Sequence, residues 1–299
     1  MNIVKIATIS ASLTAFVLVA AKLVTGLATG SMAVVSSAVD SLLDMAISLF
    51  NLYAVKTSEK KPDEEFNYGR GKIEGLAALF EALLIAASGA FIIWQSAQKL
   101  IAGEEIDDPD SAIFVMIFSA VATLALVIFL SRVAKATNSL IVKSDLLHYK
   151  SDLWTNIGII AAIGIIWLTG WHFIDGAISI VIACFIIFGA FKIAKEGVFM
   201  LLDHAIEEPL LSEILRIIES APNSRSHHYL RTRRSANVYV VDCHIVFNET
   251  ISLREAHDAS DYVEEAIAAL KPEAKWLITI HLDPRNDSVE EEEVEPLLR

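Results

Sequence analysis

The sequence predicts an all-α membrane domain of six transmembrane helices at residues 1–205, followed by a small α+β domain at residues 206–286. Composition is the first observation: 54% of the residues are hydrophobic and 20% are charged, whereas about a quarter are charged in ordinary soluble proteins. The second is a series of long apolar segments in the first two thirds of the chain. The third is the change, from about Ile206, to the alternating polar and apolar pattern of a soluble domain.

Six segments are long enough to cross a bilayer, which requires about 20 mainly apolar residues. They span residues 3–27, 32–55, 73–101, 112–133, 140–168 and 173–201. The first is longer than the apolar part of a typical signal peptide and is followed by further spans, so we interpret it as a membrane helix. The fifth is plainly apolar only from Ile157.

Lysine and arginine near the ends of the spans predict the orientation, because these residues gather on the cytoplasmic side. One side collects Lys5, Lys56, Lys60, Lys61, Arg70, Lys72, Arg132, Lys135 and Lys143. The other side has only Lys22 and Lys99, and its one long loop is acidic. The sequence therefore predicts a multi-pass protein of the cell (inner) membrane with both termini in the cytoplasm.

The last third predicts an open α+β sandwich. We expect a helix at 209–220, strands at 228–233 and 238–247, a helix at 253–270 and a strand at 276–282. The second strand is indicated by alternation with a period of two residues. Residues 287–299 include four consecutive glutamates, and we expect them to form an acidic, solvated and disordered tail.

Charge and cysteine content exclude several functions. The net charge of −13 argues against nucleic-acid binding, which needs a basic surface. The two cysteines, Cys184 and Cys243, are too few for a disulfide framework or a zinc-finger set.

Four ionisable residues inside the predicted spans are candidate metal ligands, because such residues are costly in a membrane. Asp40 and Asp44 lie in the second span, and His148 and Asp152 lie in the fifth. Each pair is spaced i, i+4, so that both members face the same way. If the two faces meet, three carboxylates and one imidazole converge, a set suited to tetrahedral zinc. The alternative is that they are helix-end residues or a buried hydrogen-bond network; Asp145 is an accessory carboxylate at most.

These residues and their flanks resemble the cation diffusion facilitator family, in particular its bacterial zinc and ferrous-iron efflux members. The matching pieces are Gly30-Ser31, residues 40–44, residues 68–74, residues 146–152 and residues 201–203. The resemblance implies efflux of a divalent metal, with zinc favoured over cadmium and ferrous iron, in exchange for protons. It also implies a transporter, not an enzyme, a homodimer, and a metallochaperone-like C-terminal domain.

Further sites are implied by the resemblance alone. A metal site in the C-terminal domain would use His228, His244, His257, His281 and Asp283. The family's ion pair would join Lys72 to Asp203. In the loop between the second and third spans, family histidines are replaced by Phe66 and Arg70, which leaves only Asp63, so we expect that loop site to be absent or weak.

Proton exchange follows from ligand chemistry, because ligands must lose protons before a metal ion binds. An imidazole such as that of His148 has an ordinary pKa of about 6.5 and exchanges protons near neutral pH. Two alternatives stay open at this stage: a membrane metallohydrolase, for which no His-Glu-x-x-His motif is present, and a metal sensor or scaffold that does not transport.

Overall fold

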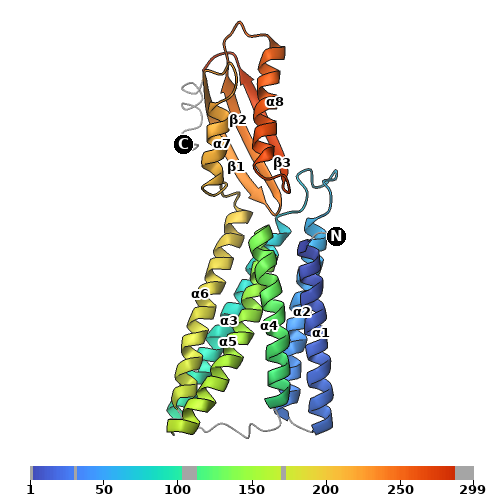
Figure 1. Cartoon of the computed structure of the whole chain (residues 1–299), viewed down its shortest axis with the longest axis vertical. Helices are drawn as coiled ribbons and strands as arrows, with labels where there is room; N and C mark the ends of the chain where they lie inside the picture. The colour runs from blue at the N-terminus through green and yellow to red at the C-terminus, as the bar shows by residue number, and fades with distance from the viewer. Residues whose placement is uncertain (1–2, 30–31, 103–112, 170–172, 287–299) are drawn as a thin grey trace. The chain divides into compact units, whose positions relative to one another are not determined.

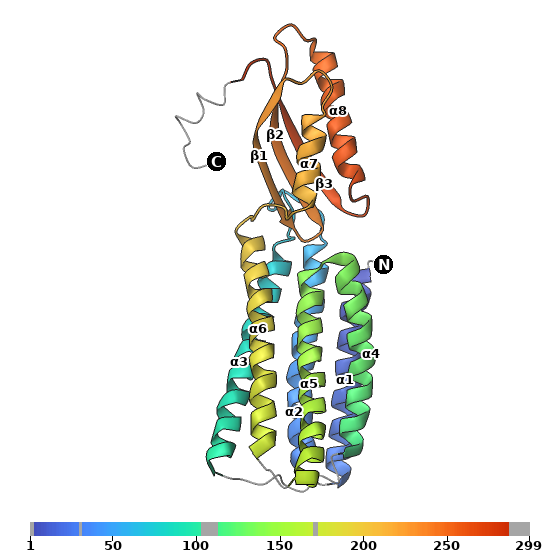
Figure 2. The ribbon, with the colours of Figure 1, turned by 60° about the vertical axis from the view of Figure 1, so that its left-hand side comes forward.

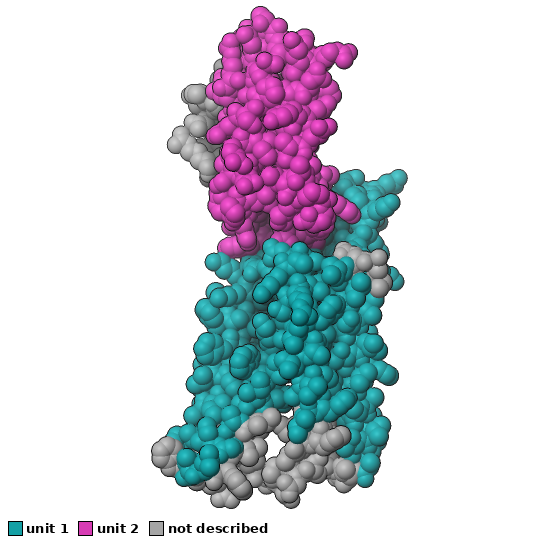
Figure 3. Space-filling view, viewed as in Figure 1, with its two compact units in different colours: residues 1–198 teal, residues 199–299 magenta. Residues whose placement is uncertain are grey.

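A computed structural model describes residues 3–29, 32–102, 113–169 and 173–286. The chain divides into two compact units, Met1–Val198 and Phe199–Arg299, coloured separately in Figure 3. The boundary expected at residues 205/206 stays a prediction. The expected acidic tail at 287–299 lies outside the described residues.

The first unit consists mainly of six long helices, which run side by side in Figures 1 and 2. They are α1 (Ile3–Thr29), α2 (Met32–Ser58), α3 (Ile73–Ala102), α4 (Ile113–Thr137), α5 (Leu140–Thr169) and α6 (Phe173–Leu201). Among the described residues, α1, α3, α4 and α6 are long and apolar enough to cross a membrane. Helices α2 and α5 carry the polar side chains of the candidate site. The chain is therefore a helical transmembrane domain followed by a smaller domain, as predicted.

Small side chains bring the helices of the membrane domain close together. Ala7 and Ala11 on α1 and Ala54 on α2 are fully buried and belong to a core shared with α4 and α5. Close contact between α3 and α6 depends on glycine, because a Cβ added at Gly197 would lie 2.8 Å from the carbonyl oxygen of Gly75. Small residues at helix contacts are the usual basis of packing in membranes.

The turn between α4 and α5 fixes where α5 begins. Asn138 has a positive φ of 53° and donates its N–H to the carbonyl of Ala134, as a left-handed helix cap does. The Ser139 hydroxyl then donates to the Glu74 carboxylate of α3. The first turn of α5 is thereby held against α3, which positions the polar residues that follow.

The second unit contains a three-stranded sheet with two helices packed against it. Its elements are α7 (Leu210–Glu219), β1 (Ser226–Ser235), β2 (Val238–Val246), α8 (Leu253–Ala269) and β3 (Lys275–Asp283). The strand order is β1-β2-β3, with β1/β2 antiparallel and β2/β3 parallel. The parallel pair is joined through α8, because parallel strands need a crossover connection. This small mixed sheet confirms the predicted α+β class.

The core of this domain lies between the sheet and its helices. Val241 and Ile245 of β2 meet Ile214 of α7 and Ile267 of α8, and all four are fully buried. A capping box between Ser252 and Glu255 begins α8. Its hydrogen bonds to Ser252 lower the pKa of Glu255. Residues of β2 that alternate with the core positions face the opposite side of the sheet, where His244 lies.

Candidate metal centres

Three of the four predicted membrane ligands come together between α2 and α5. The Nε2 atom of His148 lies 3.1 Å from Oδ1 of Asp44 and 3.8 Å from Oδ2 of Asp152. One ligand atom from each residue lies within 4.8 Å of the other two. In a tetrahedral zinc site, bonds of 2.0–2.1 Å put neighbouring ligand atoms about 3.3 Å apart. The spacing therefore suits one small divalent cation.

Asp40, the fourth predicted ligand, lies on α2 one turn before Asp44. Its side chain lies outside the part of the chain that the structure describes, so its membership of the group stays a prediction. The i, i+4 spacing from Asp44 places the two residues on one helix face.

A buried hydrogen-bond pair beside the ligands holds α5 against α1 and α2. The hydroxyl of Tyr149 donates to the carbonyl of Ala11 over 3.2 Å and lies 3.0 Å from the hydroxyl of Ser48. Tyr149 is 1% exposed. Because Tyr149 is next to His148, these contacts orient the turn of α5 that carries the imidazole.

A second polar group, which sequence reasoning missed, lies in the same membrane domain. The side-chain amide of Asn51 on α2 donates to Glu81 of α3 and to Asp145 of α5, each over 2.8 Å. Glu81 interrupts an otherwise apolar span, and that alone could have identified it. Asp145, expected to be accessory at most, joins this group instead of the Asp44/His148/Asp152 group.

The sheet of the C-terminal domain places three histidines in one row. In the strand register, His228 of β1 is paired with His244 of β2, which is paired with His281 of β3. The register of β1 shifts directly after His228, and Tyr229 there has a positive φ of 56°. Irregularities of this kind re-aim side chains next to functional sites.

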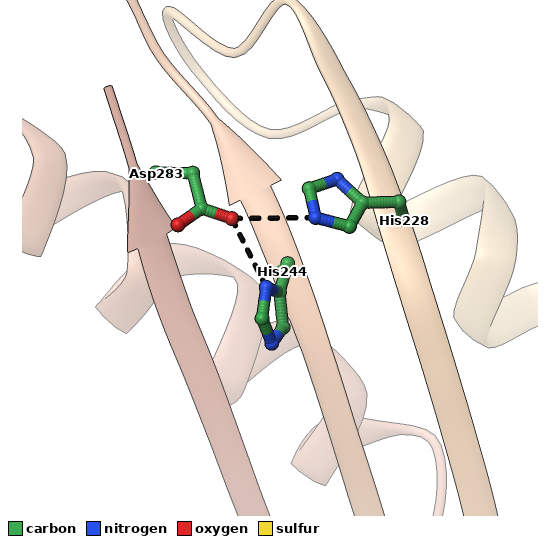
Figure 4. A group of neighbouring side chains, drawn as sticks. All are labelled: His228, His244 and Asp283. Atoms are coloured by element: carbon green, nitrogen blue, oxygen red, sulfur yellow. Dashed lines mark hydrogen bonds and ion pairs between the residues drawn. The ribbon is translucent and has the colours of Figure 1, made fainter. Parts of the chain in front are cut away.

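Asp283, two residues beyond His281, completes this candidate centre (Figure 4). Its Oδ2 lies 3.0 Å from Nδ1 of His244 and 3.4 Å from Nε2 of His228. Its Oδ1 lies 3.0 Å from Nε2 of His281. His228, His244 and Asp283 form a group whose ligand atoms lie within 4.8 Å of one another. Two imidazoles and a carboxylate are ligands that zinc accepts, so the residues present fit a metal ion.

The structure keeps the fifth predicted residue of this site apart. His257 lies on α8 and faces Asp261, with Nε2 3.7 Å from Oδ2, and its side chain is 67% exposed. It is not a member of the group that the described residues form around Asp283. Cys243 is buried, which raises the pKa of its thiol to about 12. It belongs to the apolar core on the opposite face of β2 from His244, and so it points away from the group around Asp283.

The loop between α2 and α3 contains an internal cation. Nη1 of Arg70 lies 2.6 Å from Oδ2 of Asp63, and the guanidinium covers the ring of Phe66 at 4.1 Å. The other oxygen of Asp63 accepts the N–H of Phe66 over 2.9 Å. Both carboxylate oxygens are thus engaged, and the expected lack of a metal site in this loop stays a prediction.

The predicted pair of Lys72 and Asp203 joins residues of the two units and stays a prediction. Within its own unit, Asp203 lies 3.4 Å from Nη1 of Arg233.

Comparisons with known proteins match both domains. A family model described as cation efflux transmembrane domain matches residues 8–202, and one described as cation efflux protein, cytoplasmic domain matches residues 206–285. The cation-efflux pump FieF of Yersinia enterocolitica is 36% identical over 283 residues, which is 95% of this chain and 93% of that protein. The proteins of the same name from Salmonella paratyphi A and Salmonella agona are similar to the same extent.

Proposed function

This chain belongs to the cation diffusion facilitator family of divalent metal efflux transporters, and we propose that it moves zinc out of the cytoplasm in exchange for protons. The observation that carries the proposal is the intramembrane group of Asp44, His148 and Asp152. An imidazole and carboxylates at this spacing are ligands for a small divalent ion. Cadmium and ferrous iron are the alternative cargoes, because they accept the same donor atoms.

Proton exchange follows from the donor set. The imidazole of His148 must be neutral and the carboxylates ionised to bind a metal ion, so binding releases protons and protonation releases the metal. In a protein that exposes the site to each side in turn, metal displaces protons on the cytoplasmic side and protons displace metal on the other. The two flows are then coupled through one set of side chains.

The surrounding assembly is part of the proposal. The excess of lysine and arginine on one side supports a multi-pass protein of the inner membrane with both termini in the cytoplasm. The name of the matching C-terminal family model, ZT_dimer, supports a homodimer. We also propose that the side chains of Lys72 and Asp203 form an ion pair.

The C-terminal domain would hold a resident metal ion through His228, His244 and Asp283. Bound there, the ion supplies a strong positive charge that links the three strands of the sheet through one coordination shell. One oxygen of Asp283 lies near both imidazoles, and this buried carboxylate would balance part of that charge. His281, 3.0 Å from the same carboxylate, would orient it or join the shell.

Transport in proteoliposomes tests the main proposal. Zinc entry and the accompanying pH change are followed with two fluorescent indicators, for the unaltered protein and for Asp152→Ala. We expect both fluxes to fall to the level of empty liposomes in the variant. The matched control is Asp63→Ala, which removes an aspartate outside the membrane helices and should transport normally. Zinc-driven proton flux that is unchanged in Asp152→Ala would refute the assignment.

Metal choice is decided in the same liposomes by competition among zinc, cadmium, ferrous iron and manganese. Zinc should displace the others at the lowest concentration, because one imidazole and carboxylates in a tetrahedral arrangement favour it over manganese.

The C-terminal group leaves a metal sensor without transport as a second candidate. It predicts that His228→Ala with His244→Ala abolishes the response to metal while no zinc flux exists in any variant. Transport by that double variant would exclude the sensor and leave the transport proposal standing.

A further inference from the structure

Two carboxyl groups and one amide form a buried triad in the membrane domain, which we call the Asn51 bridge. It consists of Asn51 on α2, Glu81 on α3 and Asp145 on α5. Asn51 and Glu81 are fully buried, and Asp145 is 1% exposed. The amide nitrogen of Asn51 is 2.8 Å from Oε2 of Glu81 and 2.8 Å from Oδ1 of Asp145. Both of its protons are therefore donated, one to each carboxyl.

Four oxygen atoms of this region have no hydrogen-bond partner among the described residues. They are Oδ1 of Asn51, Oε1 of Glu81, Oγ of Ser144 and Oδ2 of Asp145. Ser144, which is fully buried, faces Glu81 from α5. Unpartnered polar atoms in a buried site are uncommon and require an explanation. Here the second oxygen of each carboxyl is available to hold a proton, and the hydroxyl of Ser144 and Oδ1 of Asn51 are available to accept the hydrogen bond that a protonated carboxyl donates.

The charges around the two carboxyl groups also favour a bound proton. Within the described chain, neither Glu81 nor Asp145 forms an ion pair with a lysine or arginine, and His148 is the basic group that acts on both. His148 is itself shared by Asp44 and Asp152. Tyr149, on the same helix, is neutral when protonated and adds no positive charge. Two ionised carboxylates inside a membrane, without a cation of their own, would be strongly unfavourable.

We propose that Glu81 and Asp145 share one dissociable proton, with Asn51 as the fixed bridge, and that this pair is a proton-binding site separate from the metal ligands. One carboxyl is protonated and neutral, the other is ionised, and the amide of Asn51 binds both. The proton on the neutral carboxyl leaves to water and returns from water, with no other bond formed or broken. The inference rests on the proposed antiport, to which it adds a second place where protons are carried.

The position of the bridge suits coupling to metal. Asp145 precedes His148 by three residues on α5, about 4.5 Å along the helix axis. A divalent ion bound by His148 would therefore lie about one helical turn away and would favour the doubly ionised pair. Metal entry would release the shared proton, and metal departure would restore it. Because Glu81 belongs to α3, the proton also affects the charge at the contact of α3 with α2 and α5.

Infrared difference spectroscopy on metal-free, full-length protein in lipid nanodiscs tests the proposal. A protonated carboxyl has a carbonyl stretching band that an ionised carboxylate lacks, and this band shifts in heavy water. We expect one such band, from a buried carboxylic acid, to persist at neutral pH in the unaltered protein. It should be lost in the double variant Glu81→Gln with Asp145→Asn. It should be retained in Glu74→Gln, which alters another buried carboxyl of α3 bonded to Ser139.

The outcomes separate this proposal from the transport proposal, because the band is recorded without metal. If the band is the same in the double variant, the shared proton is refuted, whatever the zinc flux. If the unaltered protein shows no band and binds a metal ion that the double variant loses, the bridge is a metal site and the proposal is also refuted. Should the double variant not fold, each single variant decides, since each must shift the band or its titration.

A functional readout follows from the same pair. Zinc binding to the unaltered protein, measured by calorimetry in buffers of different ionisation enthalpy, should release one proton more than binding to the double variant. Equal release by the two proteins would show that the pair takes no part in the exchange.

Discussion

At the scale of single residues, charge compensation separates the candidate sites from the structural ones. The carboxylate of Asp63 is matched by the guanidinium of Arg70 at 2.6 Å. The carboxylates of Asp44 and Asp152, in contrast, share one imidazole. A carboxylate that is already paired with a fixed cation has little electrostatic reason to bind a metal ion. Two carboxylates that share one imidazole are not fully compensated when that imidazole is neutral, so a bound metal ion stabilises them. We therefore interpret the first arrangement as structural and the second as the candidate binding site.

The loop of Asp63 provides the first prediction at this scale. The hydrogen bond from Arg70 lowers the pKa of Asp63. A lowered pKa stabilises the folded loop above the ordinary pKa of an aspartate, and this stabilisation is lost as the pH falls through the lowered value. Near neutral pH the pair is fully formed. We therefore expect Asp63→Ala and Arg70→Ala to leave the number of bound zinc ions unchanged, as measured by calorimetry on the purified protein.

A metal site in the loop would give a different result. The Asp63→Ala variant would then bind one zinc ion fewer per chain. The Arg70→Ala variant would bind zinc more tightly at the loop, because a competing cation is removed. The matched comparison is Asp152→Ala, which should lose an ion in the same titration.

At the scale of helices and strands, the sequence predicts the individual elements better than the side-chain contacts between them. The predicted third span begins at residue 73, where α3 begins, because a bilayer requires a long apolar helix and the chain offers few ways to supply it. Glu81 and Asp145 lie on different helices, and only packing brings both to the side-chain amide of Asn51. No local pattern in the sequence records that contact.

The C-terminal histidines illustrate the same limit. The row of His228, His244 and His281 depends on the pairing register of three strands and on an irregularity in β1. A register shift of one residue would turn a strand's side chains to the opposite face. Spacing along the chain does not determine that register, so the ligand set could be proposed only from the resemblance.

Helix packing gives the second prediction. A Cβ at Gly197 of α6 would lie 2.8 Å from the backbone oxygen of Gly75 in α3, and backbone cannot move aside as a flexible side chain can. Gly197→Ala should therefore force the two helices apart, at a cost of about 1–3 kcal/mol. We expect a lower thermal unfolding midpoint in detergent.

The control for this variant is Gly164→Ala on α5. A Cβ at Gly164 meets nothing within 4 Å, so alanine there should be neutral or slightly stabilising through its higher helix propensity. Equal destabilisation by the two substitutions would contradict a specific contact between α3 and α6.

At the scale of the whole molecule, the two units carry separate candidate metal sites. In the proposed transport cycle the membrane group must release its ion. Its affinity for that ion should therefore be only as high as turnover allows. The group in the sheet has no such requirement, and its carboxylate is more buried: the side chain of Asp283 is 7% exposed, against 40% for Asp152. We therefore propose a structural or regulatory role for an ion bound in the sheet and a transient role for an ion bound in the membrane group.

This division yields a third prediction, on stability. An ion that binds only the folded state stabilises it by about 2.7 kcal/mol when its free concentration is 100 times the dissociation constant. Zinc should raise the unfolding midpoint of the C-terminal unit in the full-length protein, and a chelator should lower it again. In His228→Ala with His244→Ala, the midpoint should no longer respond to zinc.

The control is His257→Ala, which alters a histidine that faces Asp261 outside the group and should keep the response. The effect should weaken as the pH falls, because protonated imidazoles cannot coordinate a metal ion. A zinc response lost in His257→Ala and kept in the double variant would move the site from the sheet to α8.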